Sequence, residues 1–319
     1  MNRRLGFALV LLIFPFSSQD PQSSSSQLSQ PPQGAQPSQA SSARSPTLDA
    51  EFLRILREPA DPMHIVGPIN FVGTKGLGVY LITTPAGHIL IGGGMPASSS
   101  TIEASIRKLG YKPEDIKILL SNHAHFDHVG TMADLNKLSG ASVEAMEGDA
   151  KLLASGGKLD YLFGADPRFY FPPVRADRVL KDGDTVELGG VKLTARLTPG
   201  HTPGCATFIT AVQDGGRSYQ VVFPDGTSVN PGTRLVHNPS YPGILEDYRK
   251  TFAVLESLHP DIYLVYHIDD SGWIAKRERA ATEGAQAFVD PDGYRSFVAD
   301  RKARFEQLVG EEKNAVRQD

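Results

Sequence analysis

The sequence predicts an α/β fold in which two packed sheets are flanked by helices. Apolar segments of strand length occur in two groups along the chain, and each group is followed by segments of helix length. A polar run, His123 to His128, directly follows one of the buried strands. Because α/β sheets place their functional sites at the carboxyl ends of strands, we expect this run to lie at the rim of a sheet.

The first group of elements is marked by apolar runs and by glycine or proline at the turns. Pro85-Ala86-Gly87 predicts a hairpin, and Gly110 and Gly140 mark the ends of two helices. The predicted strands are 78–84, 88–91, 116–120 and 142–146, and the predicted helices are 101–109, 131–138 and 148–154. An irregular, aromatic and proline-rich stretch, 161–175, follows them.

The second group repeats this layout without repeating the sequence. Gly189-Gly190 and Asp214-Gly215-Gly216 predict two hairpins. The predicted strands are 185–188, 191–197, 206–212, 219–223 and 262–266, and the predicted helices are 244–258, 275–288 and 294–308.

The N-terminal region has the composition of a targeting segment followed by a linker. Positive charge in 1–4 and an apolar stretch in 5–16 predict a signal peptide over 1–18, so we expect a periplasmic or secreted protein. The apolar stretch is shorter than a stable membrane span requires. Residues 19–47, rich in Ser, Gln and Pro, predict a disordered tether, and the length of 48–319 suits a single α/β domain of ordinary size.

Composition excludes some classes of function. The net charge is −4, the pI is about 6.1 and no run of five or more basic residues occurs, which argues against a nucleic-acid enzyme. The single cysteine, Cys205, excludes an internal disulfide, and we interpret it as a small buried residue.

His123, His125, Asp127 and His128 place three imidazoles and one carboxylate within six residues. These are ligands that zinc accepts, and a metal pair can activate water and stabilise a leaving group. His201, in a turn-rich loop after one predicted strand, and His267, directly after another, could reach the same rim. The other four histidines, His64, His88, His237 and His259, lack such a context.

These motifs resemble the metallo-β-lactamase superfamily, and within it the subclass B3 metallo-β-lactamases. The pattern His-x-His-x-Asp-His is the most specific, and Gly200-His201-Thr202-Pro203-Gly204 supports it. Further matching stretches are 76–84, 238–242 with 246–249, and 290–294, so the resemblance spans about 48–308. It implies an αββα sandwich with a metal site at one edge.

The resemblance also implies a ligand set and a reaction. One zinc ion would be held by His123, His125 and His201, and the second by Asp127, His128 and His267. A hydroxide bridging the metals, oriented by Asp127 as catalytic residue, would attack the amide carbonyl of a β-lactam antibiotic. Ser228 would be a contact for this small-molecule substrate.

The chain departs from the B3 pattern at three places. Gly92 stands where the superfamily usually has an aspartate that supports the ligand loop, and Gly226 replaces a serine. Asp269-Asp270 follows His267, where the two acids would either repel a substrate carboxylate or cap the next helix.

Three alternatives follow from these departures. Asp225 could bridge the metals, as in lactonase and glyoxalase-II-like members, which would favour a lactonase or a thioesterase-like hydrolase. A non-catalytic metal-binding protein would follow if Gly92 had cost the site its activity.

Overall fold

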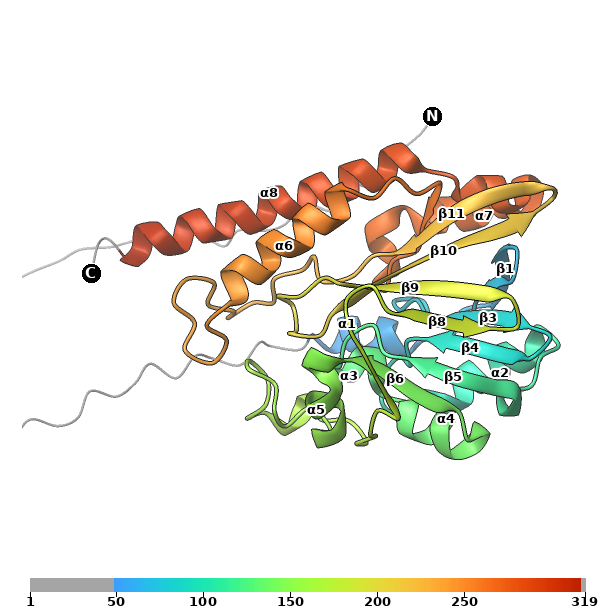
Figure 1. Ribbon diagram of the computed structural model, residues 1–319, viewed down its shortest axis with the longest axis horizontal. Coiled ribbons are helices and arrows are strands. Elements are labelled where there is room, and N and C mark those ends of the chain that lie inside the picture. The colour runs from blue at the N-terminus through green and yellow to red at the C-terminus, as the bar shows by residue number, and fades with distance from the viewer. Residues whose placement is uncertain (1–48, 317–319) are drawn as a thin grey trace, which may run out of the picture. The chain divides into compact units, whose positions relative to one another are not determined.

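The computed structural model describes residues 49–316, apart from the side chains of Asp269, Asp270 and Val316. The predicted signal peptide and tether, 1–47, lie outside the described residues. Two sheets pack face to face and helices cover their outer faces, as the sequence predicts (Figure 1). No helix within 49–316 is both long and apolar enough to span a bilayer.

The first sheet has seven strands in sequential order. β1 to β4 pair antiparallel and β4 to β7 parallel. The strands are β1 (Met63–Val66), β2 (Ile69–Phe71), β3 (Tyr80–Thr84), β4 (Gly87–Ile91), β5 (Ile116–Leu120), β6 (Ser142–Met146) and β7 (Arg178–Leu180). The parallel half directs the carboxyl ends of β4, β5 and β6 to one rim, where the polar run begins.

The second sheet has five strands in the order β12-β11-β10-β9-β8, antiparallel except for β12, which runs parallel to β11. The strands are β8 (Thr185–Leu188), β9 (Val191–Leu197), β10 (Ala206–Asp214), β11 (Arg217–Phe223) and β12 (Ile262–Tyr263). The loops that follow β9, β11 and β12 carry the candidate residues His201, Ser228 and His267, respectively.

The helices lie in two outer layers. α2 (Ser99–Lys108), α4 (Met132–Ser139) and α5 (Glu147–Ser155) cover the first sheet, and α6 (Ile244–Glu256) and α8 (Pro291–Val316) cover the second (Figure 1). α1 (Ala50–Arg57), α3 (Phe126–Val129) and α7 (Trp273–Glu283) complete the described α-helices. Short 3-10 turns lie at 113–115, 167–169, 268–271 and 284–288.

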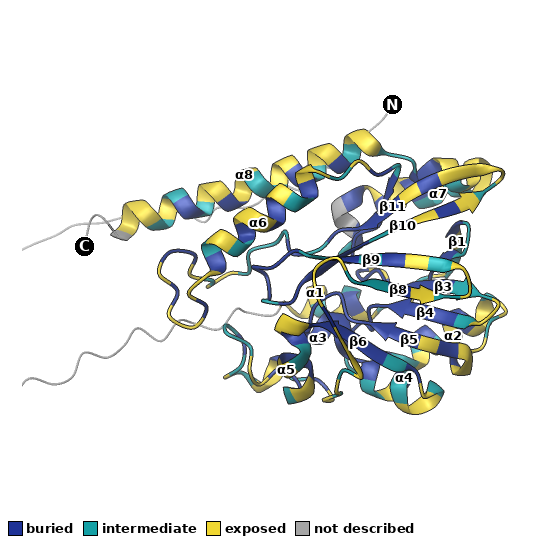
Figure 2. Cartoon of the chain, in the orientation of Figure 1, coloured by how far each residue is buried: buried dark blue, intermediate teal, exposed yellow. Residues whose placement is uncertain are grey.

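Alternation along the strands produces three apolar layers. On β3, Tyr80 and Ile82 point between the sheets, whereas Leu81 points toward the helices on the outer face. Phe223 contributes to the layer between the sheets, and Tyr248 and Phe305 to the layer beneath α6 and α8. Figure 2 shows the strands mostly buried and the helices exposed on one side, as a four-layer sandwich requires.

Several boundaries differ from the sequence-based expectation. The segment 262–266 pairs as a strand only at Ile262–Tyr263, because the chain then turns toward Gly78, whose N–H donates to the Tyr266 carbonyl. The predicted helix 275–288 ends at Glu283, since Gly284 has a φ of +55°. α1, β1, β2 and β7 have no counterpart in the expectation.

One buried ion pair joins α7 to the start of α8. Lys276 Nζ lies 2.9 Å from Asp290 Oδ2, and Lys276 is only 6% exposed. Burial lowers the pKa of Lys276. Burial alone would raise the pKa of Asp290, but the contact with Lys276 lowers it below its usual value. Asp290 Oδ1 also accepts a hydrogen bond from Gly293 N–H at the helix start.

We expect Asp290→Asn to lower the free energy of unfolding by about 2 kcal/mol, because a buried ammonium loses its counter-charge. This expected loss of stability is smaller than that for a fully buried pair because Asp290 is one-third exposed. Asparagine keeps the acceptor for Gly293. Urea denaturation measures the change, and Glu256→Gln, in the exposed pair with Lys302, is the control expected to change little. Equal effects of the two substitutions would contradict the assignment.

Candidate metal centre

The candidate ligands converge at one rim of the sandwich from three separate segments. His123, His125, Asp127 and His128 occupy the loop after β5 and the short helix α3. His201 comes from the loop between β9 and β10, and His267 follows β12. The structure thus brings together all six residues that the sequence singled out.

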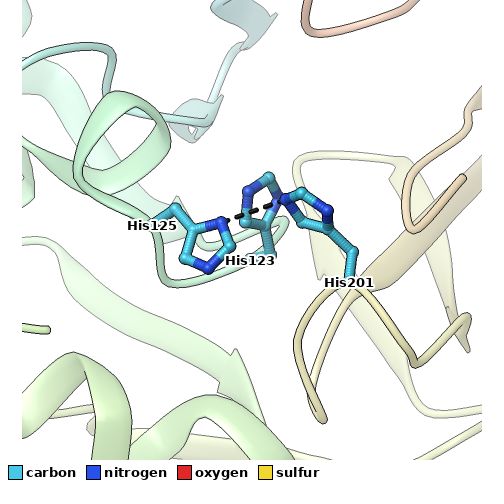
Figure 3. A group of neighbouring side chains, drawn as sticks. All are labelled: His123, His125 and His201. Atoms are coloured by element: carbon cyan, nitrogen blue, oxygen red, sulfur yellow. Dashed lines mark hydrogen bonds between the residues drawn. The ribbon is translucent and has the colours of Figure 1, made fainter. Parts of the chain in front are cut away.

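They form two groups of three. In each group the candidate ligand atoms lie within 4.8 Å of one another. The first triad is His123, His125 and His201, and Figure 3 shows its three rings converging. His125 Nδ1 lies 3.0 Å from His201 Nε2. The second triad is Asp127, His128 and His267, in which the two histidine Nε2 atoms are 3.3 Å apart.

The donor set fits metal ions. Two nitrogens that bind one zinc ion tetrahedrally at about 2.0–2.1 Å lie roughly 3.3 Å apart, close to the separations in both triads. His123 Nε2 is buried and has no hydrogen-bond partner within 49–316. An unpartnered buried imidazole nitrogen is costly unless something binds it.

Burial keeps part of the donor set ready for a cation. Burial lowers the pKa of His123 well below its usual value and that of His201 to about 4, so both rings are neutral at pH 7. Burial opposes ionisation of Asp127, but the neighbouring imidazoles of His128, His267 and His123 together hold the pKa of that carboxyl well below its usual range. Neutral imidazoles and an ionised carboxylate are the forms that bind metals.

Carboxylates and carbonyls stand behind the first triad. His123 Nδ1 lies 2.7 Å from Asp225 Oδ2, and His201 Nδ1 lies 2.8 Å from the Ser228 carbonyl oxygen. His125 Nε2 lies 3.1 Å from Asp160 Oδ2, and this contact raises the pKa of His125 against the effect of burial. Such partners fix the orientation of a ligating ring.

A buried carboxylate, Asp149 on α5, connects the two ligand loops. Its Oδ2 accepts from Ala124 N–H at 2.8 Å and from Thr202 Oγ1 at 2.7 Å, and its Oδ1 accepts from Gly204 N–H at 2.7 Å. Burial raises the pKa of Asp149 to about 6. Neither Asp149 nor Asp160 has a local signal in the sequence, since each acts on residues distant in the chain.

The remaining candidates take the following places. Ser228 lines the cavity, but its Oγ lies 3.1 Å from His201 Nδ1, so the hydroxyl also contacts a candidate ligand. Cys205 is fully buried and burial raises the pKa of its thiol. The side chains of Asp269 and Asp270 lie outside the described part of the chain.

A cavity of about 490 Å³ opens onto both triads. Phenylalanine side chains form much of its wall, and Phe52 of α1 stacks near His267 with ring centroids 6.4 Å apart. Its volume lies in the range of small-molecule sites. Residues 161–175, irregular as expected, contribute Phe163 and Phe169 to this wall.

Comparisons with known proteins agree with this geometry. The chain is similar to the FEZ-1 metallo-β-lactamase from Legionella gormanii, with 40% identity, a TM-score of 0.79, and coverage of 81% of this chain and 98% of that one. It is similar to BJP-1, a subclass B3 metallo-β-lactamase of Bradyrhizobium japonicum, with 36% identity, a TM-score of 0.78, and coverage of 83% and 99%.

Curated relatives match over shorter stretches. An N-acyl homoserine lactonase of Bacillus cereus is 26% identical over 160 residues, which are 43% of this chain and 59% of that protein. The chain spans between about a third and three fifths of the length of such relatives.

The family model for the metallo-β-lactamase superfamily matches residues 79–267, more than half of the chain and the stretch from β3 to the last candidate ligand. With two facing sheets, two triads at their shared rim and neighbours aligned over nearly their whole length, the chain belongs to the metallo-β-lactamase superfamily and is a metal-dependent hydrolase.

Proposed function

We propose that the chain is a zinc-dependent β-lactamase of the B3 type. His123, His125 and His201 would hold one zinc ion, and Asp127, His128 and His267 the other. Bound zinc would supply Lewis acidity and lower the pKa of water from about 15.7 toward about 7. The observation that carries the choice of substrate is the position of Asp225.

Asp225 separates the β-lactamase interpretation from the lactonase one. A bridging carboxylate would have to reach both triads. Asp225 Oδ2 instead lies behind the His123 ring, 2.7 Å from Nδ1, and Asp225 shares no candidate ligand group with Asp127, His128 or His267. This position favours the B3 arrangement, in which both metals are held without a bridging protein carboxylate.

The residues around the triads suit hydrolysis of a cyclic amide. Asp127 lines the cavity and its ionised carboxylate can accept a hydrogen bond from the attacking water, which would orient the water toward the carbonyl. The phenylalanine wall would pack on the fused rings and exclude bulk water. Each triad combines two residues that follow β5 with one residue from the second half of the chain, so substrate would be held between the two halves of the sandwich.

The test is a comparison of substrate classes on purified, zinc-loaded protein. We expect hydrolysis of a carbapenem or a cephalosporin that a chelator stops and added zinc restores. The same preparation should hydrolyse an N-acyl homoserine lactone and an acyl thioester with a lower kcat/KM. Chelator-sensitive turnover that is faster on the lactone or the thioester would overturn the proposal in favour of that substrate.

Arg301 on α8 is expected to bind the carboxylate that β-lactams carry. Among the described residues that line the cavity, it is the only lysine or arginine, and its guanidinium carbon lies 5.7 Å from the Phe297 ring centroid. Because a charged hydrogen bond contributes about 1.5–3 kcal/mol and this site is partly open to solvent, we expect Arg301→Met to raise KM about tenfold with little change in kcat.

Steady-state kinetics on a carbapenem measure this effect. Arg304→Met is the matched control, since Arg304 lies one turn further along α8 and lines a neighbouring hollow rather than this cavity. A fall in kcat without a rise in KM would contradict a role in substrate binding.

A further inference from the structure

Asn122, the residue directly before His123, touches both triads. It is fully buried. Its Nδ2 lies 3.1 Å from His123 Nδ1 and 3.1 Å from His128 Nδ1, so one amide reaches a ring of the first triad and a ring of the second. Among the hydrogen bonds between described residues, no other side chain outside the triads does this.

The other supporting side chains each serve one ring. Asp160 contacts His125, Asp225 contacts His123, and Ser228 contacts His201. Asn122 Nδ2 also lies 2.8 Å from Asp225 Oδ2, so the amide and this carboxylate form a small network behind the two rings. Among the described residues outside the two triads, Asn122 is the only one whose side chain lies within hydrogen-bond distance of the His128 ring.

Asn122 also lies beside Gly92, where the superfamily usually has a supporting aspartate. A Cβ built on Gly92 would lie 3.8 Å from Asn122 Oδ1 and 3.6 Å from the Gly78 carbonyl oxygen. Asn122 Oδ1 is buried and has no hydrogen-bond partner within 49–316. The amide therefore faces the space that a carboxylate at residue 92 would enter.

We propose that Asn122 is the positioning residue that replaces the absent carboxylate at Gly92 and couples the two metal sites. The proposal rests on metal binding by both triads. An imidazole that gives Nε2 to a metal carries its hydrogen on Nδ1 and is oriented by an acceptor there. His123 has Asp225 for this purpose. The His128 ring instead packs against the Asn122 amide, which the hydrogen bond from its own Nδ2 to Asp225 Oδ2 holds in place.

A double-mutant cycle on zinc affinity tests the proposal. The two zinc affinities are measured by competition with a chromophoric chelator, in the absence of substrate. We expect Asn122→Ala to weaken both sites about 10–100-fold, as loss of a ligand-orienting partner does. Asp160→Asn, which alters a contact of His125 only, should weaken one site.

Rescue by Gly92→Asp distinguishes positioning from general damage. Gly92 has a φ of +81°, which aspartate adopts at a cost of about 1–2 kcal/mol, and its Cβ would meet only ordinary contacts. In the Asn122→Ala background, Gly92→Asp should recover a large part of both affinities. In the wild-type background it should add little.

Three results would overturn the proposal. They are unchanged zinc affinities in Asn122→Ala, weakening of a single site, and a folded Asn122→Ala protein that Gly92→Asp does not rescue. If Asn122→Ala does not fold, Asn122→Ser is measured in the same cycle and decided by the same criteria. Because zinc is measured without substrate, a chain that binds two zinc ions in this coupled way but hydrolyses no β-lactam would overturn only the proposed function.

Discussion

Replacing His123 by alanine is expected to lower kcat/KM for a β-lactam by more than about 10³-fold. Loss of a partner that only orients a ligand costs about 10–100-fold, and removal of the ligand itself costs more. His123 contacts other members of both triads, with ring centroids 4.7 Å from His201 and 3.9 Å from His128. We therefore expect the variant to bind fewer than two zinc ions per chain.

Zinc content by elemental analysis and hydrolysis rates measured on the same preparation check this expectation. His64→Ala is the matched control, because His64 is exposed on β1 and belongs to neither triad. Added zinc should restore a chelated wild-type protein but not the His123→Ala variant. Full activity of a folded variant that holds one zinc ion would show that the first triad is dispensable.

Much of the fold could be predicted because local signals agree with the tertiary structure. β5 and β6 have the predicted bounds, since each is an apolar run bounded by polar or turn residues. β7 has no such signal: only Leu180 of its three residues is buried, at the edge of the sheet. The strand predicted to reach Tyr266 is shorter because pairing with Gly78 redirects the chain, and this contact joins residues far apart in sequence.

The six candidate ligands were accessible to sequence reasoning, whereas their support was not. Four of them form one compact motif, and His201 and His267 follow predicted strands. Asp149, Asp160 and Asn122 act through hydrogen bonds that only the folded chain creates. The sequence showed that residue 92 lacks the usual supporting aspartate, and the structure places the amide of Asn122, in the loop after β5, beside that position.

Gly226 also has a meaning that the sequence could not supply. As a replacement for serine it suggested a lost hydroxyl. In the structure its φ is +85°, and a Cβ there would lie 2.1 Å from the Thr198 carbonyl oxygen. The glycine is therefore required by the backbone of this loop, which also carries Asp225 and Ser228 toward the first triad.

Removing the Asp149 carboxylate is expected to have the largest effect on stability at the site. Asp149→Ala leaves two backbone N–H groups, of Ala124 and Gly204, and the Thr202 hydroxyl without their acceptor in a buried position. Since each unsatisfied buried group costs about 1–3 kcal/mol and neighbouring losses are not additive, we expect the free energy of unfolding to fall by about 3 kcal/mol. Urea denaturation of the metal-free protein measures this loss.

The same substitution should also weaken metal binding, because Asp149 holds the loop of His123 and His125 against the loop of His201. These loops follow strands of different sheets, and no strand pairing joins them. Asp134→Ala, at an exposed position on α4, is the matched control for loss of an acidic side chain. A loss of stability with the zinc affinity of the first triad unchanged would show that the two loops keep their spacing without Asp149.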